Sequence, residues 1–386
     1  MNKHTALLGA VAGAIAITFA SGCASHDDVT DLTSQARAAA KTSGLNLETA
    51  KGAELHIYTW SDYISPDVIV NFEKALGCKI IIDTFDSNEQ MYAKLKAGGT
   101  GYDIIMPSSY QIATMAREKM VVALDHSRIP NVKKNFDKSF ASQILDPSFK
   151  YNVPYAVTYT GFCYQKDKIP EGAEPDSWAR LANPALKGRV TLLDDIREVI
   201  GAGLMYLGYS INSTNPAEID KAVEQVLKWK VNIRKFDSES YKTEVPSGAT
   251  YLGHGYSTDA TQVIVGDEEE GTEAREDIGF ALPKEGFTIA FDEMVVATGS
   301  KRPDVAYAFI NYIYDPDVAA ANMDYICGPN PVAPGIAKLD EEYRNQIILD
   351  EATLEHGQVL KSFDDKPEVM ELYNKAWDRI KATDNK

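Results

Sequence analysis

The first clear strand signal in the chain is the stretch LHIYTWSDY at residues 55–63. Apolar residues alternate along its first half, and Ser61 and Asp62 break the alternation, so a strand is predicted to end there. Trp60 and Tyr63 would then lie at the carboxyl end of a first α/β unit, where open α/β sheets bind ligands. Ring faces and a carboxylate at that position favour a cation, because both attract positive charge. Simple burial of the two rings is an equally good interpretation of this segment alone.

Strand and helix signals alternate downstream of this stretch. Ser65 followed by Pro66 predicts a helix start, and an isoleucine-rich strand follows at residues 79–85. Residues 87–90 (SNEQ) have the form of a capping box that opens the next helix, before a third strand at residues 103–106. Short connections between alternating elements predict a parallel sheet with helices on both faces.

The rest of the chain continues the α/β pattern. Further strands are predicted at residues 156–164, 189–193 and 287–297, and an amphipathic helix at residues 367–381. The acidic segment at residues 266–279 is interpreted as a solvated loop or helix end. The fold class is therefore α/β.

The composition limits the class of protein. The 386 residues suffice for two domains of ordinary size, and 44% hydrophobic with 25% charged residues is typical of a soluble globular chain. With 56 acidic against 39 basic side chains the net charge is −17, which argues against nucleic acid as a partner, since that would need a basic face. The same negative charge is compatible with a cationic ligand.

The N-terminus carries a targeting signal. A basic start, an apolar run over residues 5–20 and small residues before Cys23 predict a secretory signal peptide at residues 1–22. Cys23 resembles the lipidated cysteine of bacterial lipoproteins, and plain cleavage that releases a soluble protein is the alternative. Residues 23–53 are small and polar and are expected to form a tether between the lipid and the folded body. We therefore expect a periplasmic or otherwise extracytoplasmic protein, anchored to the membrane.

Motifs of catalysis and metal binding are missing from the sequence. It has no His-Glu-x-x-His, Gly-x-Ser-x-Gly or phosphate-binding Gly-x-x-x-x-Gly-Lys motif. Cys78, Cys163 and Cys327 match no metal-site spacing and permit at most one disulfide. No cofactor and no metal are expected.

Aromatic and acidic residues recur where strands are predicted to end. Besides residues 60–63, they occur at residues 108–110 (SSY), at Asp195 and Glu198, and at residues 291–293 (FDE). Asp195 and Glu198 are three apart and share a helix face, although acids in a first helical turn also serve the helix dipole. A further alternative makes these two acids the acid–base pair of an enzyme.

At these segments the sequence resembles a known family, the bacterial extracellular polyamine-binding proteins that deliver spermidine or putrescine to an ABC importer. The resemblance runs from about Leu55 to the C-terminus, and its motifs are too many and too widely separated for chance agreement. They are Tyr58-Thr59-Trp60-Ser61-Asp62-Tyr63, Asn71-Phe72-Glu73-Lys74, Asp86-Ser87-Asn88-Glu89, Met91-Tyr92-Ala93-Lys94-Leu95-Lys96, Tyr102-Asp103-Ile104-Ile105-Met106-Pro107-Ser108, Asp194-Asp195-Ile196-Arg197-Glu198-Val199, Pro283-Lys284-Glu285-Gly286 and Asp315-Pro316-Asp317-Val318-Ala319.

The resemblance implies a two-lobed periplasmic-binding-protein fold, type II-like, in which each lobe is a parallel-dominated sheet flanked by helices and the ligand cleft lies between the lobes. Chain order places lobe one at residues 54–155 plus 291–334 and lobe two at residues 156–290 plus 335–386. The implied function is capture of a polyamine and its delivery to the membrane subunits of an ABC importer, by a monomer that is not an enzyme. The alternatives are the same fold binding a different small amine or amino acid, or acting as a ligand-sensing receptor component.

The resemblance also implies which positions bind the ligand. In the family, aromatic rings enclose the aliphatic amine chain, while carboxylates and hydroxyls bind the ammonium groups. The matching positions are the rings of Trp60, Tyr63 and Tyr110, the hydroxyl of Ser108, the nearby carboxylate of Asp62, the acidic end formed by Asp195 and Glu198, and the carboxylate of Asp292 for an inner amine.

Two rings expected from the family have no match here. A family tryptophan falls at about His254, with an uncertainty of one residue, and a second aromatic position is Ala290. Tyr256 or Phe291 would replace one of these rings, or the pocket is wider. His254 and Tyr256 are therefore included as candidate ligand-binding residues, and a protonated His254 would repel an amine.

Overall fold

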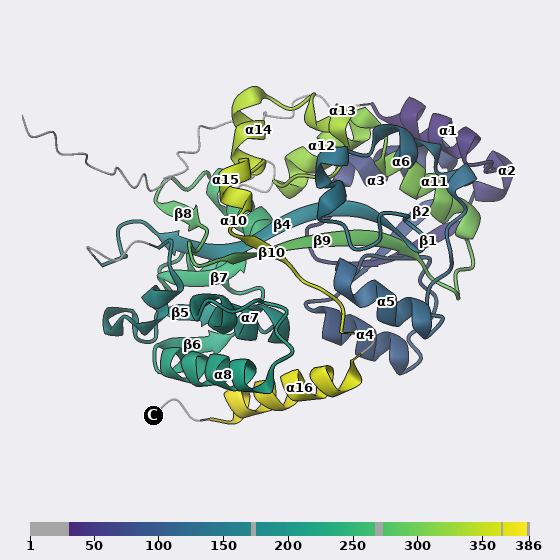
Figure 1. The fold of residues 1–386 in the computed structure, drawn as a ribbon. Coiled ribbons are helices and arrows are strands. Elements are labelled where there is room, and N and C mark those ends of the chain that lie inside the picture. The colour runs from purple at the N-terminus through teal and green to yellow at the C-terminus, as the bar shows by residue number, and fades with distance from the viewer. Residues whose placement is uncertain (1–30, 171–174, 267–272, 364–365, 384–386) are drawn as a thin grey trace, which may run out of the picture.

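The computed structural model describes residues 31–383 apart from 171–174, 267–272 and 364–365. These residues form two lobes that share one continuous sheet, with helices packed on its faces (Figure 1). The predicted α/β class is confirmed.

The sheet runs in the order β2-β1-β3-β9-β4-β7-β5-β6, with β8 added to β4 and β10 to β9. Its strands are β1 (Glu54–Thr59), β2 (Lys79–Thr84), β3 (Ile104–Ile105), β4 (Asn152–Gln165), β5 (Val190–Leu192), β6 (Ile233–Phe236), β7 (Leu252–Tyr256), β8 (Ile278–Ala281), β9 (Phe287–Val296) and β10 (Gly357–Val359).

Parallel pairing is confined to the outer part of each lobe and to the short strand β10. In the first lobe β1 is parallel to β2 and β3, and in the second lobe β5 is parallel to β6 and β7. The long strands β4 and β9 lie between these groups and pair antiparallel to each other and to their neighbours β3 and β7. Because β4 and β9 belong to both lobes, the sheet as a whole is mixed.

The helices fall into two groups around the sheet (Figure 1). Around β1 to β3 lie α1 (Thr33–Thr42), α2 (Leu47–Ala50), α3 (Pro66–Leu76), α4 (Asn88–Lys96), α5 (Ser109–Arg117), α6 (Pro130–Asn135), α11 (Pro303–Ile313), α12 (Pro316–Ile326) and α13 (Ala333–Ile336). Around β5 to β7 lie α7 (Ile196–Tyr206), α8 (Pro216–Lys230), α9 (Tyr241–Glu244), α10 (Ser257–Val265) and α16 (Pro367–Ala382).

Shorter segments complete the chain. The helices α14 (Glu341–Ile347) and α15 (Glu351–Leu354) lead into β10. Single turns of 3-10 helix occur at His126–Arg128, Lys138–Ser142, Trp178–Ala182 and Pro184–Leu186.

Helix starts follow the predicted sequence signals. Pro66 stands in the first turn of α3, and Gly77 ends that helix with a φ of 70°, a left-handed conformation that favours glycine. The Ser87 hydroxyl accepts a hydrogen bond from the backbone N–H of Gln90 at 3.2 Å and caps α4. Both predicted helix starts are confirmed.

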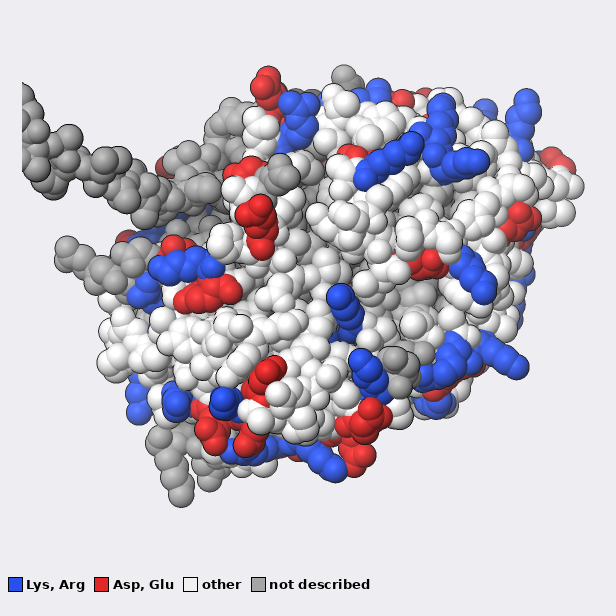
Figure 2. All heavy atoms as spheres, viewed as in Figure 1, with Lys and Arg blue, Asp and Glu red and all other residues white. Residues whose placement is uncertain are grey.

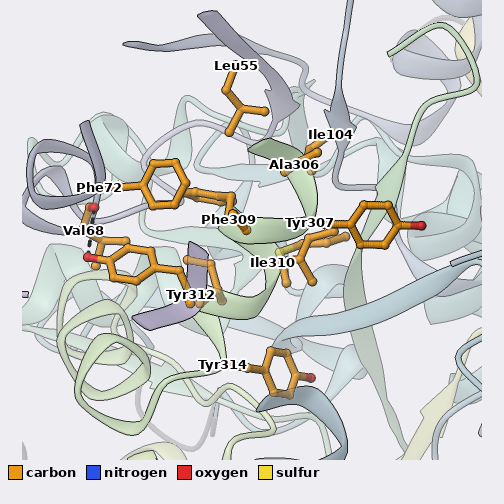
Figure 3. Packing of buried hydrophobic residues seen from close by; sticks show 14 of the residues in the cluster. Leu55, Val68, Phe72, Ile104, Ala306, Tyr307, Phe309, Ile310, Tyr312 and Tyr314 are labelled. Carbon is orange, nitrogen blue, oxygen red and sulfur yellow. Dashed lines mark hydrogen bonds between the residues drawn. The ribbon is translucent and has the colours of Figure 1, made fainter. Parts of the chain in front are cut away.

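Aromatic rings fill the core of the first lobe, as Figure 3 shows. Phe72 of α3 packs against Phe309 and Tyr312 of α11, with ring centroids 5.2 and 5.3 Å away. The Tyr312 hydroxyl donates to the backbone carbonyl of Val68 at 3.3 Å, so its one polar atom is satisfied inside an apolar cluster. This packing fixes α3 and α11 against the sheet and thereby positions the chain that follows β1.

The predicted tether at residues 23–53 is wrong from Leu32 onward. The side chains of Leu32, Ala36 and Ala40 are fully buried, and α1 packs on α3 and α11. The backbone N–H of Leu32 donates to Asn71 of α3 at 3.1 Å. The small residues that suggested a linker instead allow close approach of two helices. The predicted signal peptide at residues 1–22 and Cys23 lie outside the described residues.

The second lobe includes the C-terminus of the chain. Leu360, Phe363 and Tyr373 are buried in the same cluster as Trp178 and Trp229, and the predicted C-terminal helix is confirmed as α16. The residue limits predicted for the two lobes stay predictions. Within the described residues no helix is both long and apolar enough to cross a bilayer.

The surface does not segregate its charges on the face that Figure 2 shows. Acidic and basic side chains alternate over both lobes there, and no continuous basic stripe is visible on that face among the described residues.

Candidate ligand-binding site

A cavity lies between the lobes where several strands end. Trp60 follows β1, Ser108 follows β3, Asp195 follows β5 and Tyr256 ends β7, and all four line it. The space between protein atoms is about 630 Å³, part of it open to solvent, which is room for a small molecule.

The cavity brings together most of the residues that the sequence singled out. Those that line it are Trp60, Tyr63, Ser108, Tyr110, Asp195, Glu198, Tyr256 and Asp292. They come from both lobes and from widely separated parts of the chain.

Asp292 lies at the centre of a hydrogen-bond network. One carboxylate oxygen accepts from Ser108 Oγ at 2.6 Å and the other from the Tyr63 hydroxyl at 2.6 Å. Asn88 fixes Ser108 from the opposite side, donating to its Oγ at 3.0 Å and accepting from its backbone N–H at 2.9 Å. The carboxylate is therefore held rigidly although it has no basic partner among the lining residues.

Asp195 and Glu198 form a second acidic group at the start of α7. One oxygen of Asp195 caps the helix by accepting from the backbone N–H groups of Arg197 and Glu198, at 2.8 and 2.9 Å. Glu198 accepts from the hydroxyls of Thr160 and Thr288, at 3.2 and 2.8 Å. Asp195 thus has the capping role proposed as an alternative and also faces the cavity.

Four aromatic rings line the cavity, those of Trp60, Tyr63, Tyr110 and Tyr256. Trp60 packs edge-on against Phe85 at 4.5 Å between ring centroids. The Trp60 Nε1 and the Tyr110 hydroxyl are buried without a hydrogen-bond partner. Buried polar atoms normally find partners, so these two atoms are available to a bound molecule.

Burial dominates the electrostatics of the cavity. It raises the pKa of Asp292 to about 6 and the pKa of Glu198 to about 8, and it also raises the pKa of Asp195 and of Asp259. Each shift reflects a carboxylate that has lost water without gaining a cation sufficient to offset the loss. A bound cation would stabilise the ionised forms.

Two predicted site residues do not line the cavity. Asp62 lies at its rim, with 60% of its side chain exposed, and its carboxylate is 3.3 Å from the ammonium of Lys242. His254 is fully buried between the rings of Phe162 and Trp178, 6.3 and 5.1 Å away. Burial lowers its pKa to about 3, so a neutral core histidine stands where a ligand contact was expected.

Strand alternation explains which of the candidate rings reaches the cavity. Ala290 and Asp292 on β9 line it, whereas Phe291 between them packs on the opposite face with Phe140. Tyr256 lines the cavity, whereas His254 does not. Tyr256 is therefore the better candidate for the ring that replaces the family tryptophan. Phe291 is thereby excluded as a replacement ring.

Sequence reasoning missed about half of the lining residues. They are Ser61, Asp86, Asn88, Thr158, Glu239, Thr258, Asp259, Ala290 and Leu360. Ser61 and Asn88 lie in segments that were noticed but given no role, and Ala290 was noted as a departure from the family. Asp259 comes three residues after Tyr256 at a helix start, the same spacing as Asp195 and Glu198, and this signal could have found it.

Within the described residues no group of three His, Cys, Asp or Glu side chains is arranged to hold a metal. Cys78 and Cys163 are buried free thiols, and Cys327 is buried as well.

The sequence profile of the bacterial extracellular solute-binding proteins matches residues 67–349 of this chain. The chain belongs to that family. A solute-binding protein with two lobes and a ligand cavity between them agrees with the geometry described above.

Individual relatives of this solute-binding protein cover two thirds or more of the chain. A putrescine/cadaverine-binding protein of Pseudomonas aeruginosa is 34% identical, covering 85% of this chain and 93% of the relative. The putrescine-binding periplasmic protein PotF of Escherichia coli is 36% identical over 69% of this chain and 75% of its own. A structure described as a putative spermidine/putrescine ABC transporter from Listeria monocytogenes superposes with a TM-score of 0.77, at 33% identity, over 86% of this chain and 99% of that one.

Proposed function

We propose that this solute-binding protein captures a linear polyamine, putrescine or spermidine, outside the cytoplasm and delivers it to the membrane subunits of an ABC importer. The observation that carries the proposal is the charge of the cavity. Its lining residues include six carboxylates and not one lysine or arginine, and the acids are Asp86, Asp195, Glu198, Glu239, Asp259 and Asp292.

The arrangement of these acids fits a ligand that carries positive charges at two or more separate positions. Asp195 and Glu198 belong to the second lobe, whereas Asp292 is bound to Ser108 and Tyr63 of the first. An ammonium that leaves water must gain charge-assisted hydrogen bonds, or its burial costs several kcal/mol. Acids on both lobes allow a cation with two ammonium groups to hold the lobes together.

The aromatic rings fit the aliphatic part of such a ligand. An extended diamine loses rotational freedom on binding, and flat rings along its methylene groups offset this loss by close contact. Trp60, Tyr63, Tyr110 and Tyr256 provide that contact. A neutral chain of the same length would gain from the rings but would leave the carboxylates buried without counter-charges.

The proposal has a cellular side as well. The relatives named as periplasmic proteins support an extracytoplasmic location, and Cys23 would carry the lipid anchor. We propose a monomer that binds and releases its ligand unchanged, without cofactor or catalysis.

Calorimetric titration of the mature protein tests this function. The ligands are putrescine, spermidine and 1,4-butanediol, which has the length of putrescine but no charge. We expect heat of binding with at least one amine and none with the diol. Binding of the diol as tightly as of putrescine, or no binding of either amine, would contradict the proposal.

A further inference from the structure

A lysine lies at one end of the acidic cavity. Lys242 on α9 of the second lobe places its ammonium 2.7 Å from a carboxylate oxygen of Glu239 and 3.3 Å from one of Asp62. Its side chain is 18% exposed. Glu239 lines the cavity, and its carboxylate also accepts from the Ser61 hydroxyl at 3.3 Å. The lysine therefore joins the two lobes at the rim of the site.

The acids beside Lys242 already have partners within the protein. Asp259, which lines the cavity, accepts from the Tyr241 hydroxyl at 2.5 Å. Burial alone would favour a neutral Lys242, but the negative charges of Asp259, Glu239 and Asp62 raise its pKa. The lysine is a permanent cation in the midst of three carboxylates.

The acids at the other end of the cavity have no such partner among the lining residues. Asp292 is bound only by hydroxyls, and Glu198 by two threonines. Besides burial, the charges of Asp195, Glu198 and Asp292 raise the pKa of Tyr256. Burial together with the charges of Asp292 and Asp259 raises the pKa of Tyr63. Asp195 and Glu198 line the cavity at the start of α7, Asp292 lines it beside Ser108 and Tyr63, and Glu239 lines it beside Ser61.

We propose that Lys242, a built-in ammonium group directly behind the lining residue Glu239, neutralises the acids at the rim end of the cavity and so limits the length of polyamine that the site accepts. This inference rests on the proposed function and names the ligand within it. A diamine needs counter-charges at two points, and Asp195 with Glu198 and Asp292 supply them. A third ammonium at the rim would meet Glu239, whose charge is already paired with Lys242, and the nearby lysine would repel it.

The chemistry of the lysine side chain makes it a suitable stand-in. Four methylene groups carry its primary ammonium, so it resembles one end of a polyamine that is tethered to the protein. A tethered group competes at a high effective concentration with a free one. The site then prefers putrescine, with two ammonium groups, over spermidine, with three.

Three variants and two amines test the proposal by calorimetry. Lys242→Met keeps the length of the side chain but removes its charge, Lys242→Arg keeps the charge, and Lys235→Met is the matched control. Lys235 on β6 also pairs with two acids, Asp237 and Glu244, at 3.2 and 3.0 Å, but neither of these acids lines the cavity, whereas Glu239 beside Lys242 does.

In the unmodified protein we expect a lower Kd for putrescine than for spermidine. Lys242→Met should improve spermidine affinity relative to putrescine by about tenfold, on the scale of one partly screened like-charge contact. Lys242→Arg and Lys235→Met should keep the original ratio of the two affinities. Thermal unfolding of each variant shows that the fold is intact.

Two results would overturn the inference. An unchanged ratio in Lys242→Met, with both amines weakened equally, would mean that the lysine only holds the lobes together. Spermidine binding more tightly than putrescine before any substitution would mean that a third ammonium is accommodated despite the lysine. A third result is different in kind. If the unmodified protein bound neither amine, the proposed function would be wrong, and the inference would fail with it.

Discussion

The carboxylate of Asp292 receives two hydroxyl hydrogen bonds and is 5% exposed. In Asp292→Asn the shape stays but the charge is lost, so a bound ammonium would remain buried without its counter-charge. We expect the Kd for putrescine to rise by about 30-fold or more, since breaking a buried charge pair costs about 2–5 kcal/mol. Calorimetry measures the change.

The neighbouring acid provides the control for this substitution. Glu293 is equally buried on the same strand but faces Ser109 and Asn152 on the other side of the sheet. Glu293→Gln should leave the Kd within about threefold of its original value. If Asp292→Asn bound putrescine normally, the central role of Asp292 would be wrong.

Substitution of His254 is predicted to stabilise the protein without a change in ligand binding. Both nitrogens of its ring are buried without a partner, and an unsatisfied buried polar group costs about 1–3 kcal/mol. His254→Leu should therefore raise the free energy of unfolding by about 1 kcal/mol and leave amine binding unchanged. Denaturant unfolding and calorimetry on the same samples measure both.

The pH dependence of that stability gain has a definite sign. Burial lowers the pKa of His254 to about 3 in the folded protein, below the value near 6.5 of an unfolded histidine. Its neutral form therefore supports the fold above about pH 6.5, and that support is lost as the pH falls toward 3. The advantage of His254→Leu should grow over this window. If His254→Leu lost amine binding, His254 would be a ligand-binding residue after all.

At the scale of elements, α7 combines a structural and a binding role in one residue. Asp195 caps the helix with one oxygen, and both Ser and Asp are good caps. Asp195→Ser should keep the melting temperature nearly unchanged while it weakens amine binding about tenfold or more through loss of charge. Asp195→Ala should lose about 1 kcal/mol of stability in addition.

These two variants separate the functions of Asp195. Thermal unfolding reports the cap and calorimetry reports the charge. If Asp195→Ser bound putrescine as well as the original protein, capping would be the whole role of Asp195.

The sequence predicted several elements well, and the failures have physical causes. The strand β9 and the helix α16 were predicted because alternation and helical periodicity are local properties. The helix α1 was missed because small polar residues serve equally in linkers and in closely packed helices. At β7 the family tryptophan was matched to His254, which lies in the core beside Phe162 and Trp178, whereas Tyr256 two residues later ends the strand and lines the cavity. The two side chains share one face of the strand, so alternation could not tell them apart.

At the scale of the whole molecule, the acidic cavity couples ligand binding to pH. The pKa of Asp292 is raised to about 6 and that of Glu198 to about 8, above the usual values near 4. In the ligand-free protein, the protonated forms of these two acids therefore stabilise the fold at low pH. That stabilisation is lost as the pH rises through about 6 to 8 and the acids ionise. A bound diamine favours the ionised acids and reverses the loss.

The rise in melting temperature caused by saturating putrescine should thus be larger at pH 8 than at pH 5.5. Thermal unfolding with and without the amine measures it, and other titrating groups largely cancel in the difference. Equal rises at the two pH values would mean that Asp292 and Glu198 do not change ionisation on binding.

The joining of the lobes could be predicted only in outline. Resemblance to a family indicated two lobes and the positions of most site residues, but spacing along the chain did not place Glu239 or Asp259 in the cavity. In the sequence alone, an acid that lines a cavity cannot be distinguished from an acid in a solvated segment. Only the fold, which brings the lobes together, places these two acids in the cavity. The antiparallel pair of β4 and β9 that runs through both lobes is a non-local contact of the same kind.

The packing of α1 on the first lobe would limit where this protein can work if our proposal of a lipid on Cys23 holds. If Cys23 carries a lipid, the buried Leu32 is only nine positions further along the chain, and a fully extended chain of that length spans at most about 32 Å. The protein would then stay in a thin layer beside its membrane and meet the importer by lateral diffusion in two dimensions. Encounter would depend on the density of importers in that membrane and hardly at all on the volume of the surrounding compartment.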